Sequence, residues 1–258
     1  MFPSGTTRPF GPEGPQAKHP EDASVLAELL DIFFPPVCPL CEGGIAEGLF
    51  CKACAEGLSS QKILGPKCGV CGVPFVSASS PDHTCGVCQT QKMPFVSSRS
   101  ALAYNGAVVE AVHSFKYGGK VMLGRPLGRL LAESISLPFA PHAVIPVPLH
   151  KKRLRTRGFN QSLLLAREVS RRLGARVDYT NLKRLKNTAQ QVKLKTDERR
   201  ENVKGAFALK RPGEVEGRTV LLIDDVYTTG ATIMECSKVL KKAGALVHAL
   251  TLARTVKV

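Results

Sequence analysis

A run of four apolar residues at 220–223 leads directly into two aspartates and then into a turn rich in threonine and glycine. The apolar run predicts a buried strand, and open α/β sheets bind ligands outside the carboxyl ends of their strands. The turn, TTGAT at 228–232, precedes a helical pattern, so its N–H groups and hydroxyls would face an anion. The adjacent carboxylates can accept hydrogen bonds from a ribose diol. Residues 219–232 are therefore predicted to bind a phosphorylated ribose.

Within this segment the expected roles divide between two sets of residues. Asp224 and Asp225 are the candidate catalytic and ribose-binding residues. The candidate phosphate-binding residues are Thr228, Thr229, Gly230, Ala231 and Thr232. Two other interpretations stay open: a metal-binding phosphoryl-transfer site, and an ordinary strand end followed by a threonine helix cap. A P-loop is excluded because the chain has no G-x-x-x-x-G-K-[ST] sequence.

Strand and helix patterns alternate from residue 100 onward. Apolar stretches predict strands at 101–104, 143–147, 220–223 and 247–252. Apolar stripes at helical spacing lie between them, formed by Leu123, Leu127, Leu130 and Leu131, by Phe159, Leu163, Ala166, Val169 and Leu173, and by Ile233, Cys236, Leu240 and Ala243. Such alternation predicts the α/β class, with a Rossmann-like, largely parallel sheet covered by helices.

Eight of the nine cysteines form four C-x-x-C pairs, which are Cys38/Cys41, Cys51/Cys54, Cys68/Cys71 and Cys85/Cys88. Two such pairs complete one tetrahedral site, so eight sulfurs predict two zinc ions. Four thiolates leave no position for water, which favours structural zinc over catalytic zinc, and an iron–sulfur cluster is the less favoured occupant. Sequential pairing is the simplest arrangement, although the spacing also allows an interleaved one. Cys236, on an apolar helix face, is predicted to be a small buried hydrophobic residue.

Composition divides the chain into three parts. Residues 1–20 are rich in proline and glycine and are expected to form a disordered leader. Residues 21–90 hold a short amphipathic helix and then the cysteine pairs, with too little aliphatic content for a core of their own. Residues 100–258 hold the α/β domain. The chain lacks a secretory signal and an apolar run near the ~18 residues of a membrane span, so we expect a cytoplasmic protein without such a span.

The net charge of +15 indicates a polyanionic partner, although a solvated basic surface would give the same value. Five basic residues follow the predicted strand at 143–147, where they could neutralise a diphosphate: Lys151, Lys152, Arg153, Arg155 and Arg157. Residues 183–204, which include Arg199, hold eight Lys or Arg against three acids. Residues 115–118, FKYG, are a weaker candidate for a ligand-facing turn.

The segment VLLIDDVYTTGAT resembles the phosphoribosyl-diphosphate binding motif of type I phosphoribosyltransferases. With VIPVPLHKKRLRTRGFNQSLLLAREVS and RLKNTAQQVKLKTDERRENVKGAF, it makes the chain similar to the ComF/GntX family. These are competence-associated bacterial proteins with an N-terminal double zinc ribbon, and the resemblance covers roughly residues 25–255. It implies a type I phosphoribosyltransferase fold, with Asp224 and Asp225 on the ribose hydroxyls and residues 228–232 on the 5-phosphate. It further implies a pyrophosphate loop at 148–158 and a mobile flap at 183–204.

The resemblance also implies a ligand and a setting. The ligand would be phosphoribosyl diphosphate with Mg²⁺, and an enzyme would displace pyrophosphate from it with an acceptor that the sequence does not reveal. The link to competence and DNA uptake comes from the resemblance alone. Two alternatives are a non-enzymatic ligand-sensing binder and a single-stranded DNA-binding competence factor. The latter is weakened by the aromatic content of 6% and the lack of tryptophan, since base stacking needs aromatic rings.

Overall fold

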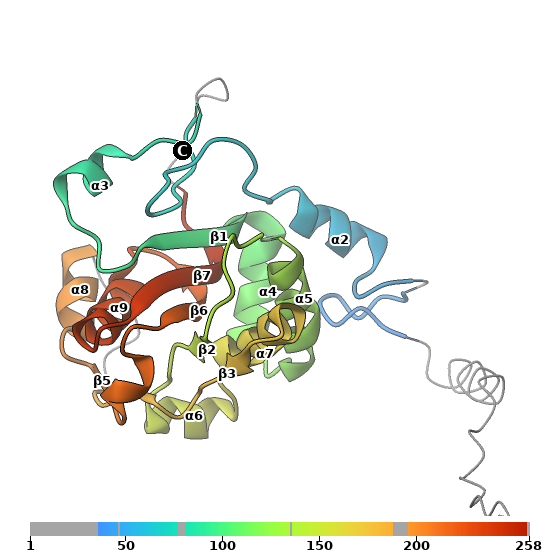
Figure 1. Cartoon of the computed structure of the whole chain (residues 1–258). Helices are drawn as coiled ribbons and strands as arrows, with labels where there is room; N and C mark the ends of the chain where they lie inside the picture. Colours follow the sequence, from blue (N-terminus) through green and yellow to red (C-terminus); the bar gives the residue numbers. More distant parts are fainter. Residues whose placement is uncertain (1–35, 46, 77–80, 135, 188–195, 257–258) are drawn as a thin grey trace, which may run out of the picture.

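A five-stranded parallel sheet with the order β1-β7-β6-β2-β3 forms the centre of the protein (Figure 1). The computed structural model describes residues 36–45, 47–76, 81–134, 136–187 and 196–256. The strands of this sheet are β1 (Ser97–Ala103), β2 (Ala143–Pro146), β3 (Arg176–Val177), β6 (Thr219–Tyr227) and β7 (Leu246–Arg254). The predicted α/β fold with a parallel sheet is confirmed. The expected leader at 1–20 and the helix from Glu21 lie outside the described residues.

Helices cover both faces of the sheet (Figure 1). One face carries α4 (Gly106–Tyr117), α5 (Gly124–Glu133) and α7 (Gln161–Leu173), and the other carries α8 (Thr196–Val203) and α9 (Ala231–Lys242). Along β6, Leu221 and Ile223 pack with the first group, whereas Val220 and Leu222 pack with the second. A strand buried on both faces needs an unbroken apolar run, which explains residues 220–223.

The strands β4 (Leu182–Arg184) and β5 (Phe207–Leu209) pair antiparallel and form a separate two-stranded sheet. Helix α8 falls between its two strands, so the predicted flap at 183–204 contains a strand and a helix. Its residues 188–195 lie outside the described part. Two 3-10 turns, η1 (Val121–Leu123) and η3 (Pro212–Val215), complete the α/β part.

The segment 148–158 differs from the expected loop because it contains helix α6 (Lys151–Arg157). His150 caps the start of this helix, with its Nδ1 accepting from Lys152 N at 3.3 Å. Gly158 ends the helix in a left-handed conformation at φ 81°. The sequence KKRLRTR consists mostly of good helix formers, so two capped ends suffice to make it helical.

The cysteine pairs lie in two small lobes that share the core of the α/β part. The first lobe includes α2 (Lys52–Ser59), and its buried residues Phe50 and Leu58 join the hydrophobic cluster beneath α4, α5 and α7. The second lobe includes α3 (Gly86–Thr90), and its Cys68 and Cys71 join the cluster beneath α9. Each lobe thus obtains from the sheet the apolar packing that its own sequence lacks.

Candidate functional site

The two aspartates lie together at the carboxyl end of β6, near the middle of the sheet. Asp224 Oδ1 accepts hydrogen bonds from Ser162 Oγ and from Asp225 N, both at 2.9 Å. Ser162 is the second residue of helix α7, and its N–H donates to Oδ1 of the N-cap Asn160 at 3.1 Å. The Asn160 side chain also donates to Val147 O at 3.0 Å. The helix start and the end of β2 therefore hold Ser162 in place to orient Asp224.

Lys116, near the end of α4, forms an ion pair with Asp225, with Nζ and Oδ1 2.9 Å apart. Burial and the neighbouring Asp225 raise the pKa of Asp224 to about 7, although Lys116 and Ser162 act against this. Burial alone would lower the pKa of Lys116, but the two aspartates raise it above its ordinary value. The site thus combines two close carboxyls with one cation, and perturbed pKa values of this kind are typical of functional sites.

The predicted phosphate-binding residues 228–232, called the phosphate loop below, follow β6 and lead into helix α9. Gly230 is the N-cap, with a left-handed φ of 75°, and Ala231 N donates to Thr229 Oγ1 at 3.4 Å. No acidic residue lies in the first turn of α9. A shallow pocket here is lined by Asp224, Val226, Tyr227, Thr228, Gly230, Ala231, Thr232 and Ile233. All five predicted phosphate-binding residues thus lie together at the start of a helix, which favours an anion.

Basic side chains of α6 and β4 lie close enough to affect each other, and the one on β4 also interacts with Asp224. Burial, and then repulsion from Arg157, lowers the pKa of Arg153 on α6. Burial, and then repulsion from Arg153, lowers the pKa of Arg184 on β4, while Asp224 opposes that change. Arg157 also lies over the ring of Tyr117, 5.1 Å from its centroid. Crowded guanidinium groups of this kind fit a polyanion, which would relieve their mutual repulsion.

The other predicted basic residues are placed differently. Lys151, Lys152 and Arg155 are exposed on α6. Arg199 belongs to α8, but its side chain lies outside the described residues. Residues 115–118 were expected to form a ligand-facing turn, but residues 115–117 end helix α4 and only Gly118 lies beyond it. Nothing in the sequence pattern singles out Ser162.

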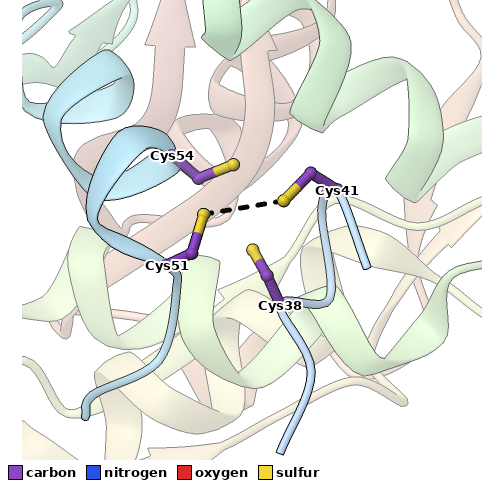
Figure 2. Close-up of side chains that lie close together, drawn as sticks. All are labelled: Cys38, Cys41, Cys51 and Cys54. Carbon is purple, nitrogen blue, oxygen red and sulfur yellow. Dashed lines mark hydrogen bonds between the residues drawn. The ribbon is translucent and has the colours of Figure 1, made fainter. Parts of the chain in front are cut away.

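The first cluster consists of Cys38, Cys41, Cys51 and Cys54, whose sulfurs all lie within 4.8 Å of one another (Figure 2). Cys41 Sγ and Cys51 Sγ are 3.5 Å apart, close to the ~3.8 Å between sulfurs that tetrahedral Zn–S bonds require. Burial alone would raise the pKa of Cys38, but backbone N–H groups of Cys41 and Cys51 lower it to about 6. The lowered pKa favours the thiolate form of Cys38 over the thiol, and the thiolate is the form that binds a metal.

The second cluster consists of Cys68, Cys71, Cys85 and Cys88, and its four sulfurs also lie within 4.8 Å of one another. Cys71 N and Cys85 N each donate to Cys68 Sγ at 3.4 Å, which overcomes the effect of burial and lowers the pKa of Cys68 to about 6. Both clusters pair the cysteines sequentially, so the simplest predicted arrangement is confirmed. Two clusters of four sulfurs are consistent with two structural zinc sites. Cys236 is buried in α9, as predicted.

A parallel sheet with an Asp-Asp pair and a TTGAT helix start at its carboxyl edge defines the phosphoribosyltransferase class of α/β domains. Two family models match the chain: the double zinc ribbon domain at residues 29–89 and the phosphoribosyl transferase domain at residues 160–256. These matches correspond to the two cysteine clusters and to the half of the α/β part that contains the Asp pair. No helix within the described ranges is both long and apolar enough to cross a membrane.

Similar proteins span nearly the whole chain. Competence protein F of Haemophilus influenzae is 35% identical over 225 residues, covering 82% of this chain and 93% of that protein. DNA utilization protein YhgH of Escherichia coli O6:H1 is 33% identical over 219 residues, with the same coverage. Competence protein ComFC of Bacillus subtilis is 32% identical over 212 residues, covering 80% and 84%. The chain belongs to the ComF/YhgH family, which joins a double zinc ribbon to a phosphoribosyltransferase domain.

Proposed function

We propose that the chain binds phosphoribosyl diphosphate with Mg²⁺ at the carboxyl end of β6. The observation that carries this proposal is the succession of Asp224, Asp225, left-handed Gly230 and the acid-free first turn of α9. A 5-phosphate fits the start of α9, because the first N–H groups of a helix have no acceptor within it. The ribose would then lie over the end of β6, where the carboxylates accept hydrogen bonds from its hydroxyls.

The diphosphate would be bound on the side of Arg153, Arg184 and Lys116. These cations come from three different elements. Burial and then Arg157 lower the pKa of Arg153, and burial and then Arg153 lower the pKa of Arg184. Arginine can bind two phosphate oxygens at once, and lysine provides a point charge. Mg²⁺, held by the diphosphate and by Asp224 and Asp225, would neutralise charge on the leaving group.

This arrangement also suits transfer of the phosphoribosyl group. A bond from an acceptor to the anomeric carbon would form while the bond to the diphosphate oxygen breaks and pyrophosphate leaves with the electron pair. The contribution of this chain would be position and charge: carboxylates beside the electron-poor sugar and cations beside the leaving group. The relatives named for competence and DNA utilization support a role in the use of incoming DNA.

Two zinc ions would stabilise the ribbons. Each cluster supplies four sulfurs and leaves no open ligand position, so zinc here would hold the fold. None of the nine cysteines forms a disulfide, which suits a reducing compartment such as the cytoplasm.

A phosphorus NMR titration tests the ribose-phosphate assignment. Phosphoribosyl diphosphate with Mg²⁺ should show perturbation of its 5-phosphate resonance on addition of the zinc-loaded protein, because that phosphate would meet the start of α9. Thr232→Val should weaken this perturbation, while Thr90→Val, which removes an exposed hydroxyl on α3, should not. A perturbation confined to the diphosphate resonances would contradict the proposed orientation.

A second candidate function is binding of single-stranded DNA across α6 and the two-stranded β4–β5 sheet. Burial and then Lys210 lower the pKa of Lys183, and Asp178 opposes this change. Arg211 and Lys151 lower the pKa further, so basic groups outnumber carboxylates around Lys183. Such a surface would neutralise backbone phosphates, and binding would then weaken steeply with salt. Fluorescence anisotropy with a labelled oligonucleotide tests this: Lys183→Met/Lys210→Met should reduce the salt dependence. An unchanged salt dependence would contradict it.

A further inference from the structure

The second cluster is fixed to the sheet through the carbonyl groups of its first knuckle. Arg99 on β1 donates to Gly69 O at 2.9 Å and to Cys68 O at 3.4 Å, and Ser98 N donates to Val70 O at 2.7 Å. The next carbonyl, that of Cys71, accepts from Arg254 Nη1 at 2.7 Å. Four consecutive carbonyls of this knuckle therefore accept hydrogen bonds from β1 and β7.

Arg254, the last residue of β7, is a buried cation, with 5% of its surface exposed. It forms no ion pair with any carboxylate in the described part of the chain. A buried charge is costly unless an opposite charge lies near it. Four thiolates around one divalent ion leave a net negative charge, and Arg254 contacts this cluster at Cys71. The contact is made to the carbonyl oxygen of Cys71, and a metal-loaded second cluster would place a negative charge next to Arg254.

Arg254 also contacts the end of β6, where the phosphate loop begins. Tyr227 and Arg254 are register partners on β6 and β7, and the guanidinium carbon lies 4.8 Å from the centroid of the Tyr227 ring. Tyr227 is itself buried, with 8% of its surface exposed. A desolvated cation over an aromatic face is attracted to it more strongly than in water, so Arg254 fixes the plane of the Tyr227 ring.

The Tyr227 ring lies against Gly230. A β-carbon added at Gly230 would lie 2.9 Å from Tyr227 Cε1 and closer still to its hydroxyl. Gly230 adopts its left-handed conformation directly above this ring and begins helix α9. The position of the ring therefore determines where the first N–H groups of α9 point.

We propose that Arg254 and Tyr227 are positioning residues that link the second cluster to the phosphate loop, so that metal loading of this cluster sets the affinity for the ribose phosphate. This inference rests on the proposed function above. Contacts run without a gap from Cys71 through Arg254 and Tyr227 to Gly230. When the cluster loses its metal, Arg254 loses its counter-charge, the Tyr227 ring loses its anchor, and the loop above it loosens.

The test compares two arginines that both donate to the same knuckle. Arg254→Met removes the contact with Tyr227, whereas Arg99→Met removes knuckle contacts on β1 and leaves Tyr227 untouched. Two quantities are measured on full-length, zinc-loaded protein: the rate of zinc release to a chromogenic chelator, and the affinity for phosphoribosyl diphosphate with Mg²⁺ by calorimetry. We expect both variants to release zinc faster in the phase that belongs to the second cluster.

Only Arg254→Met should also weaken ligand binding, by about ten-fold, the scale of one charged hydrogen bond with a cation–π contact. Arg254→Lys keeps the charge and should lose only about three-fold. Should Arg254→Met fail to fold, Arg254→Lys against Arg99→Lys carries the same comparison, with a loss expected in the former alone.

Two results would overturn this inference without touching the proposed function. One is wild-type ligand affinity in the Arg254 variants, and the other is an equal loss of affinity in the Arg99 and Arg254 variants. A wild-type protein that binds no phosphoribosyl diphosphate would instead overturn the proposed function and, with it, this inference.

Discussion

Lys116 on α4 and Asp225 on β6 form an ion pair at the carboxyl edge of the sheet, with 2.9 Å between Nζ and Oδ1. The side chains are 21% and 10% exposed, so water screens this pair only partly. Asp224 lies beside it and adds a second negative charge. Lys116 is thus the cation that allows two adjacent carboxyls to lie in a largely buried site.

Removal of Lys116 is expected to destabilise the protein most at high pH. Lys116→Met leaves Asp225 without its partner, which should cost about 2 kcal/mol of unfolding free energy at pH 8. The cost should fall at pH 5, because Asp224, whose pKa is raised to about 7, is then protonated and no longer repels Asp225. Urea unfolding at both pH values measures this, and Lys116→Met/Asp225→Asn should recover part of the loss. An equal loss at both pH values, or a double variant less stable than the single one, would contradict the role of the ion pair.

Asp224 should make stability depend on pH near neutrality. Burial and Asp225 raise its pKa to about 7, against about 3.9 in an unfolded chain. Because the folded state holds the proton more tightly, the stabilisation is complete below pH 4 and is lost as the pH rises through 7. Asp224→Asn removes this titration, so the variant's stability relative to wild type should be greater at pH 8 than at pH 5, by ~1–3 kcal/mol. Thermal unfolding across this range measures it, and a pH-independent difference would refute it.

Gly230→Ala should damage the phosphate loop. The new side chain would hold a strained φ of 75° and overlap the Tyr227 ring. We expect a loss of ~1–3 kcal/mol in stability and a loss of at least about ten-fold in ligand affinity. Gly213→Ala is the matched control, because a β-carbon there meets nothing within 4 Å. Equal behaviour of the two variants in unfolding and in calorimetry would show that the loop tolerates a side chain.

Each chain should bind two zinc ions. Elemental analysis of the purified protein should give two per chain, and one in either Cys38→Ser/Cys41→Ser or Cys68→Ser/Cys71→Ser, because the clusters share no ligand. Chelation should lower the unfolding temperature, since the metal stabilises the ribbons. Visible absorbance from bound iron, or loss of both metals from either double variant, would contradict two independent zinc sites.

The sequence predicts the centre of the fold well, because the strongest pattern is the one most buried. Residues 220–223 are apolar without alternation because β6 lies between helices on both faces. The order Asp-Asp-x-x-Thr-Thr-Gly predicts the candidate site at the end of this strand. By contrast, β1 was expected only from residue 101, but it begins at Ser97. Its polar first half is a strand because Ser97 bonds to His248 and Ser100 to Thr251 on β7.

Other parts could not be predicted because they depend on partners distant in the sequence. The strands β3, β4 and β5 have only two or three residues, too few for a periodic pattern. Lys116 belongs to the last turn of α4, and its role becomes visible only when this helix brings it to Asp225. Arg254 likewise looks like an ordinary strand end until β7 places it beside Cys71.

The most direct test of the central claim is a calorimetric titration of phosphoribosyl diphosphate with Mg²⁺ into zinc-loaded protein. Asp224→Asn/Asp225→Asn removes the acid pair, and Glu110→Gln/Glu133→Gln removes two exposed carboxyls elsewhere as the charge-matched control. Ribose 5-phosphate serves as the comparison ligand, and it should bind more weakly because it lacks the diphosphate. We predict saturable binding by wild type and control, lost in the Asp variant. Absence of binding by well-folded wild type, or equal binding by the Asp variant, would contradict the account.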